Sequence, residues 1–368
     1  KVEVTLKDVN IDTSSRNKAA VSVTGEGDTN IKLNGDNALK SDIYRSGIYG
    51  SGSLTISGGE NDSLTAQGGS GANGISSSGS LTISGGTVTA NGDDGGRGIS
   101  SSGSVTISGG STVTANGGSG TISGGDGIWS GGGFTISGGS TVTAKGGNGG
   151  SLVGGDGIRS GGGLTVSDGT VTAKGGNGDS KDGYGGDGIR SGGGVTISGN
   201  TVNAAGGYGG KVGGYGICSF DRVAISGGTV EAAGGNGSTG GGSGIYSSVI
   251  DLSGSLELTA KAGSPTGKAL LQNGRELDLD TIKDKLGPGA KVTATDADGK
   301  VIDQVSTPRP VEPEESSSSS DGGSAAPSAP VSPLPGLTVT DKDGQRISYT
   351  STQSGNTLTV CVGRFTAS

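Results

Sequence analysis

The chain has 368 residues, of which 84 are glycine and none is histidine, and its formal net charge is −8. This acidic balance without basic clusters argues against a nucleic-acid partner, because lysine and arginine are needed to bind phosphates. No apolar run approaches the roughly 20 residues that span a bilayer, so we expect no membrane insertion. Glycine does not recur at every third position, which excludes collagen.

The first residues alternate apolar and polar side chains, as short strands do. This pattern covers residues 2–12 and continues through residues 20–25 and 30–35. Terminal units of a repeat array are usually atypical, because an exposed sheet edge must be covered or blunted. We therefore interpret these pieces as the first coils of such an array.

The body of the chain is a tandem repeat that is marked by the dipeptide Gly-Ile. Each unit holds three short extended pieces, typified by Gly-Ile-x-Ser, Leu-Thr-Ile-Ser-Gly and Thr-Val-Thr-Ala. Glycine clusters between the pieces supply the backbone angles that sharp corners need. Successive repeat isoleucines are 24 to 31 residues apart, at Ile48, Ile75, Ile99, Ile128, Ile158, Ile189, Ile217 and Ile245.

Period-two alternation predicts which side chains of a unit face inward. Ile128, Phe134 and Val142 should point into the core, and Trp129 and Thr135 should point out of it. Three short strands per turn close into a triangular coil, and coils stacked at roughly 4.8 Å form three parallel sheets. We predict an all-β fold, a single-stranded parallel β-helix of about ten coils over residues 1–280.

The glycine content falls after residue 258. Residues 281–306 are predicted to form a cap, with a short helix at 281–286 and a hairpin around Asp298-Gly299. Residues 307–336 read as a Ser/Pro-rich linker, and residues 337–368 as a small β-hairpin segment and a candidate truncated module. Cys218 and Cys361 lie in different segments, so two free thiols are expected.

An outward ladder is the first candidate site. The residues that follow the repeat isoleucines should stack along one sheet, with Trp129, Arg159, Arg190 and Tyr246 among them. Aromatic faces stack on sugar rings, and the planar arginine guanidinium donates two hydrogen bonds to a carboxylate, so the row suits an extended polysaccharide, including an acidic one. The equally weighted alternative is that Arg159 and Arg190 only pair with nearby aspartates.

Length variation is confined to one corner, between Thr-Val-Thr-Ala and the next Gly-Ile. Inserts collected at one edge of a solenoid often build its binding surface. This corner carries Tyr184, Tyr208 and Tyr215, which we add to the candidate carbohydrate-binding residues.

Three aspartates, Asp126, Asp156 and Asp187, precede Gly-Ile in successive units. Stacked carboxylates repel each other unless a cation or amide donors hold them, and calcium is the natural cation for oxygen ligands. A turn role, in which the side chains bind corner amides, is favoured over a Ca2+ site.

The repeat units Gly-Ile-x-Ser, Leu-Thr-Ile-Ser-Gly-Gly and Thr-Val-Thr-Ala-x-Gly-Gly resemble the pectate-lyase-like, carbohydrate-binding β-helix domains of clostridial (Firmicutes) cell-surface proteins. The resemblance covers roughly residues 2–280. It implies a right-handed coil, secretion and binding of plant-type polysaccharides, with calcium as a candidate cofactor. No ligand residue of that family maps onto a position of this chain.

The leading functional hypothesis is a monomeric, non-catalytic module at the bacterial cell surface that binds polysaccharide or a host or cell-wall glycan, as an adhesin does. The chain begins at Lys1 rather than methionine, which fits a removed signal peptide. A structural stalk is the first alternative. A polysaccharide lyase is the second, although the lack of histidine removes the commonest acid–base group and no catalytic residue is assigned.

Overall fold

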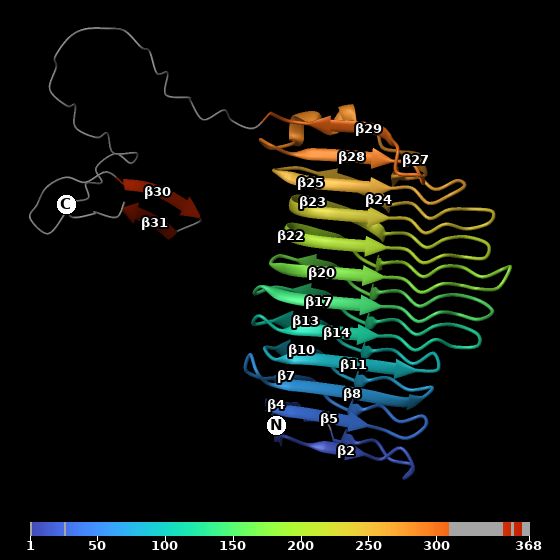
Figure 1. The fold of residues 1–368 in the computed structure, drawn as a ribbon, viewed down its shortest axis with the longest axis vertical. Helices are drawn as coiled ribbons and strands as arrows, with labels where there is room; N and C mark the ends of the chain where they lie inside the picture. The colour runs from blue at the N-terminus through green and yellow to red at the C-terminus, as the bar shows by residue number, and fades with distance from the viewer. Residues whose placement is uncertain (1, 26, 309–348, 355–356, 363–368) are drawn as a thin grey trace, which may run out of the picture. The chain divides into compact units, whose positions relative to one another are not determined.

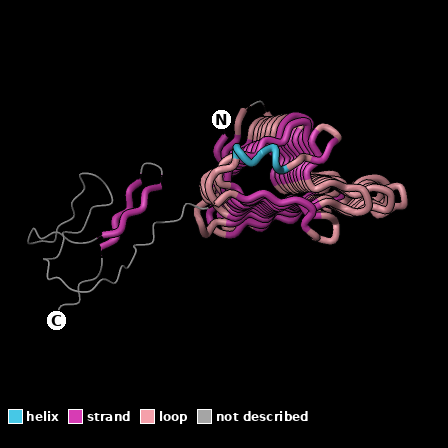
Figure 2. Tube along the Cα trace, turned by 90° about the horizontal axis from the view of Figure 1, so that it is seen from above, coloured by secondary structure: helices cyan, strands magenta, loops and turns pink. Residues whose placement is uncertain are grey.

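The structure, a computed structural model, describes residues 2–25, 27–308, 349–354 and 357–362. The chain divides into two compact units, Lys1–Pro310 and Val311–Ser368. The first unit is a parallel β-solenoid of about ten coils, so the predicted fold class is confirmed (Figure 1). A typical coil contributes one strand to each of three parallel sheets, which surround a thin core when seen from above (Figure 2).

Most strands of the first sheet begin at a repeat isoleucine, and the first and last begin at Val21 and Leu270. The strands are β3 (Val21–Val23), β6 (Ile48–Gly50), β9 (Ile75–Ser77), β12 (Ile99–Ser101), β15 (Ile128–Ser130), β18 (Ile158–Ser160), β21 (Ile189–Ser191) and β26 (Leu270–Gln272). The second sheet holds the pieces typified by Leu-Thr-Ile-Ser. Its strands are β1 (Val2–Lys7), β4 (Thr29–Asn34), β7 (Leu54–Ser57), β10 (Leu81–Ser84), β13 (Val105–Ser108), β16 (Phe134–Ile136) and β19 (Leu164–Val166).

The third sheet holds the pieces typified by Thr-Val-Thr-Ala. Its strands are β2 (Asn10–Asp12), β5 (Asp36–Lys40), β8 (Ser63–Ser70), β11 (Thr87–Asp93), β14 (Thr112–Asn116), β17 (Ser140–Lys145), β20 (Gly169–Lys174), β25 (Leu256–Lys261) and β28 (Lys291–Thr295). Three longer strands run around corners from one sheet into the next, namely β22 (Val195–Ala205), β23 (Ile217–Ala233) and β24 (Ile245–Leu252).

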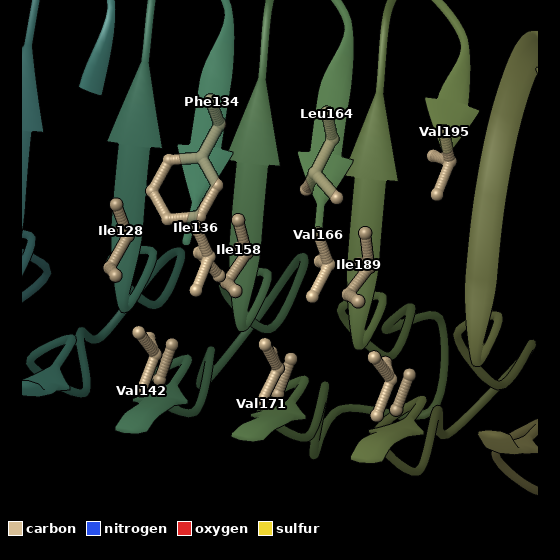
Figure 3. Packing of buried hydrophobic residues seen from close by; sticks show 14 of the residues in the cluster. Ile128, Phe134, Ile136, Val142, Ile158, Leu164, Val166, Val171, Ile189 and Val195 are labelled. Atoms are coloured by element: carbon tan, nitrogen blue, oxygen red, sulfur yellow. The ribbon is translucent and has the colours of Figure 1, made fainter. Parts of the chain in front are cut away.

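Equivalent residues of successive coils pair in register. Ile128 pairs with Ile99 and Ile158, and Phe134 pairs with Val105 and Leu164. The predicted inward side chains form the core: Ile128, Phe134 and Val142 are at most 1% exposed, and they stack on their equivalents (Figure 3). A one-residue slip would turn each strand's apolar face to solvent, so this burial holds the register in place.

The serine of Gly-Ile-x-Ser closes the corner between the first and second sheets. Ser130 is fully buried, and its single O–H is shared between the carbonyl oxygens of Gly133, at 2.9 Å, and of Gly103 in the preceding coil, at 3.0 Å. A buried carbonyl without a partner is costly, so a small hydroxyl side chain at this position satisfies the turn.

The variable corner forms glycine-rich extensions, visible as the loops beside the sheets in Figures 1 and 2. In each extension an outgoing leg leaves the third sheet and a returning leg reaches the first. The legs alternate along the solenoid axis through 2.8 Å hydrogen bonds: Gly147 N–H donates to Gly125 O, Gly155 N–H to Gly147 O, and Gly176 N–H to Gly155 O. A Cβ on Gly155 would lie 1.9 Å from Gly125 O, so only glycine permits this spacing.

The C-terminal end of the solenoid is covered by the 3-10 helix η1 (Leu279–Lys285) and by two strands, β27 (Arg275–Glu276) and β29 (Val301–Ser306). β28 pairs in parallel with β25 and antiparallel with β29. The first strand of the predicted hairpin is therefore also a strand of the third sheet. Among the described residues no helix is both long and apolar enough to cross a membrane.

The second unit contains an antiparallel pair, β30 (Tyr349–Ser354) and β31 (Thr357–Val362). The predicted linker lies outside the described residues from residue 309 onward, as do residues 337–348, 355–356 and 363–368 of the predicted tail and the side chain of Cys361.

A single methyl group tests the packing of the extensions. Gly155→Ala would place Cβ against the Gly125 carbonyl, and we expect it to lower the free energy of unfolding by about 3 kcal/mol, the upper part of the usual overpacking range. Gly199→Ala is the matched control, because its Cβ would have only one neighbour, Ser167 O at 3.8 Å. Urea denaturation measures both, and equal stability of the two variants would contradict the leg packing.

Candidate functional site

The outward ladder is present in the structure as a row on the outer side of the first sheet. Trp129 pairs with Arg159, Arg159 with Arg190, and Arg190 with Cys218, each one coil further on. The row begins with Ser22 and Tyr49 and continues through Tyr246 to Leu271. Because each step is one coil, neighbouring positions lie roughly 4.8 Å apart along the axis.

A groove runs between this ladder and the returning legs of the extensions. Its volume is about 450 Å3, and its lining includes Arg97, Arg159 and Arg190, two aspartates and the backbone of several glycines. Arg97 also covers the indole of Trp129, with its guanidinium carbon 4.6 Å from the ring centroid. The pair forms a flat, partly exposed surface of the type that stacks on rings.

Arg97 is a candidate site residue that the repeat pattern alone did not single out. It lies two residues before Ile99, at the position that Asp126 holds before Ile128. A comparison of the residues two places before each repeat isoleucine could have revealed it, because Arg97 is the basic residue at that position. Phe220 was also missed; its ring lies 5.5 Å from the guanidinium carbon of Arg190.

The three aspartates have the turn role that the sequence analysis favoured. The Oδ1 atom of each accepts a backbone N–H one coil further on: Asp126 from Asp156 at 2.9 Å, Asp156 from Asp187 at 2.7 Å, and Asp187 from Tyr215 at 2.7 Å. Asn73 accepts from Arg97 N–H in the same way at 2.8 Å. These bonds tie each returning leg to the next.

Each aspartate of this column also faces an arginine. Arg97 Nε donates to Asp126 Oδ2 at 3.1 Å, whereas the nearest Arg159 and Arg190 nitrogens lie 3.9 and 3.6 Å from the Oδ2 atoms of Asp156 and Asp187. Those two Oδ2 atoms are buried and have no hydrogen-bond partner. Burial, together with the charges of Asp187 and Asp126, raises the pKa of Asp156, and burial raises the pKa of Asp187 against the opposing charge of Arg190.

These ion pairs bear on both sequence hypotheses for this site. Each of these arginines has an aspartate oxygen within 3.9 Å, which weakens the basis for a preference of Arg159 and Arg190 for acidic sugars. Within the described part of the chain no three His, Cys, Asp or Glu side chains are grouped to hold a metal ion. Calcium binding at Asp126, Asp156 and Asp187 stays a prediction, and the amide contacts account for the column without it.

The C-terminal end of the ladder is closed over. Tyr215 and Tyr246 stack with their ring centroids 5.0 Å apart, and Cys218 between Arg190 and Tyr246 is fully buried although its position faces outward. Burial raises the pKa of the free Cys218 thiol to about 12. The thiolate is the reactive form, so this cysteine is inert near neutral pH.

The three corner tyrosines do not form one surface. Tyr215 and Tyr184 lie on returning legs, and Lys211 Nζ is 5.7 Å from the centroid of the Tyr184 ring. Tyr208 lies on an outgoing leg, beside Lys174, in a separate hollow of about 330 Å3 that faces the third sheet. The sequence showed that all three tyrosines belong to the same corner. It could not show that the outgoing and returning legs of that corner face different sheets.

The chain matches no protein-family model, and no curated protein or solved structure matches it significantly. The geometry of the described residues is therefore the basis for assigning a function.

The buried aspartates predict a pH-dependent stability. A carboxyl whose pKa is raised on folding contributes its full stability below the unfolded pKa, about 4, and loses it as the pH rises through the folded value. Asp156→Asn keeps the Oδ1 acceptor and removes the ionisation. We expect this variant to have a higher Tm than the parent at about pH 8 and the same Tm at about pH 3.5, as measured by calorimetry.

Asp126→Asn is the matched control for this experiment. It removes the 3.1 Å ion pair with Arg97, so we expect a lower Tm than the parent near pH 8. A lower Tm for Asp156→Asn at the same pH would show that the Asp156 carboxylate is well compensated in the folded state.

Proposed function

We propose that the solenoid is a non-catalytic, extracellular module of a bacterial surface protein that binds an extended polysaccharide along the outward ladder. The observation that carries the proposal is the groove lined by Arg97, Arg159 and Arg190, in which Arg97 also stacks on the neighbouring Trp129 ring. It offers a ring-stacking surface and several hydrogen-bond donors in one line along the axis. An extended polymer of rings can use such a line at successive coils.

Two features of the composition support the proposal of a surface-displayed module that binds a glycan. The Ser/Pro-rich residues 307–336 have the composition of a linker that separates a module from its neighbours. The net charge of −8 without a basic cluster gives no surface for nucleic acid. The proposed partner is a glycan of a host or of a cell wall, bound by a monomer.

A structural stalk is the second candidate function, and the hydrogen-bonded extensions favour it. Alternating legs add a continuous row of backbone bonds beside the three sheets, and this row couples each coil to the next. Such coupling stiffens an array whose units contact only their neighbours.

The Trp129 side chain is the most direct test of the ladder as a glycan site. We expect Trp129→Ala to weaken binding of any glycan that a glycan array identifies by about 1 kcal/mol or more, the size of an aromatic stacking contact. Tyr208→Ala is the control, because it removes an aromatic ring on the other side of the extension, one that is more exposed than Trp129. Equal losses in both variants would place the site elsewhere.

The three function classes are separated by one further measurement. We expect no absorbance increase from unsaturated uronides when the chain is incubated with pectic polysaccharides, while binding to the array persists. Product formation would support the lyase alternative, and neither binding nor product would support the stalk.

A further inference from the structure

A second hollow lies at the N-terminal end of the same ladder. Its volume is about 520 Å3, compared with about 450 Å3 for the groove beside Trp129. Tyr49 lines it and precedes Trp129 in the row by three coils, roughly 14 Å. Only Ser76 and Ser100 separate the two positions, so no large ladder side chain lies between the hollows.

The most unusual residue of this hollow is Tyr44. Its φ is +58°, in the left-handed region that bulky side chains avoid, and yet the residue is 76% exposed. The ring lies against Gly71 of the next coil, where a Cβ would approach two ring carbons to 3.0 Å. The left-handed backbone at Tyr44 costs conformational energy, and a solvent-exposed ring contributes little stability in return. This combination indicates that the ring has a binding role.

The hollow also differs from the central groove in its charge. Lys18 and Arg45 line it, and no carboxylate does. Within the described residues neither cation forms an ion pair; Arg45 only donates to Asn17 Oδ1, at 3.4 Å. The neighbouring Asp42 carboxylate instead accepts the backbone N–H groups of Asn17 and Ile43.

We propose that this hollow binds an anionic sugar unit, with the Tyr44 and Tyr49 rings against the sugar and with Lys18 and Arg45 at its carboxylate or sulfate. The proposal rests on the proposed function and assigns acid selectivity to this end of the ladder. At the central groove the charge of each arginine faces an aspartate, whereas here two cations face solvent. An arginine fork fits either anion, and the lysine adds a second positive charge.

Matched probes test the charge part of the proposal. The probes are tetragalacturonate, its neutral methyl ester and a sulfated galacto-oligosaccharide, with binding measured by calorimetry. We expect the parent to bind an anionic probe at least tenfold more tightly than the ester. In the double variant Lys18→Gln, Arg45→Gln this preference should fall to about twofold or less, and binding should lose most of its salt dependence.

The double variant Arg159→Gln, Arg190→Gln is the control, and it should keep the acid preference. The proposal is overturned if that control loses the preference, or if the Lys18 and Arg45 variant keeps it. If an array shows binding of neutral glycans only, through Trp129, the proposed function stands and this proposal fails. If no glycan binds at all, both fail.

A second variant separates binding from folding at Tyr44. Asparagine tolerates a left-handed φ better than tyrosine, so Tyr44→Asn should keep or raise the Tm. It should also weaken binding of both the acidic and the neutral probe at least fivefold, because the ring is lost. A lower Tm with unchanged binding would show that the ring stabilises the fold and would overturn its assigned role.

Discussion

Parallel, in-register pairing of equivalent residues is the constraint on which this molecule depends. Because Ile128 pairs with Ile158 and Ile158 with Ile189, every position of the repeat becomes a column along the solenoid axis. A column of apolar side chains is self-complementary and builds the core. A column of charges is not, since identical carboxylates about 4.8 Å apart repel each other. The structure resolves this at Asp126, Asp156 and Asp187 with amide donors on one oxygen and arginines near the other.

The extensions extend the same principle beyond the three sheets. Their legs come so close that a side chain would collide with a carbonyl, as at Gly155, and this close approach explains the glycine content of the repeats. The legs also create two sides. The returning legs face the ladder, with Arg97 and Arg159 in the groove, and the outgoing legs face the third sheet, with Lys174 and Tyr208. A solenoid with one variable corner thus acquires two separate hollows.

Departures from the repeat carry the functional hypotheses. A residue that recurs in most coils, such as the corner serine represented by Ser130, has a structural role that those coils share. By contrast, the repeat does not require Trp129, Arg97 or Tyr44, each of which occurs once at its position. Beside the ladder, the surroundings of the cations also change along the axis: within the described residues Lys18 and Arg45 form no ion pair, whereas Arg159 and Arg190 lie near aspartates. A polymer bound along the whole row would meet different chemistry at its two ends.

The sequence by itself determined the solenoid, the three strands of each coil and the sides that Phe134 and Trp129 face, because a period-two pattern within a repeat depends only on local alternation and stacking. It also supported the turn role of the aspartates. Only the tertiary structure decided that Tyr208 and Tyr215 lie on opposite sides of the extensions, that Cys218 is buried at an outward position, and that Arg97 covers Trp129. Those facts depend on how glycine-rich legs fold back and on which side chains meet between coils, and neither follows from spacing along the chain.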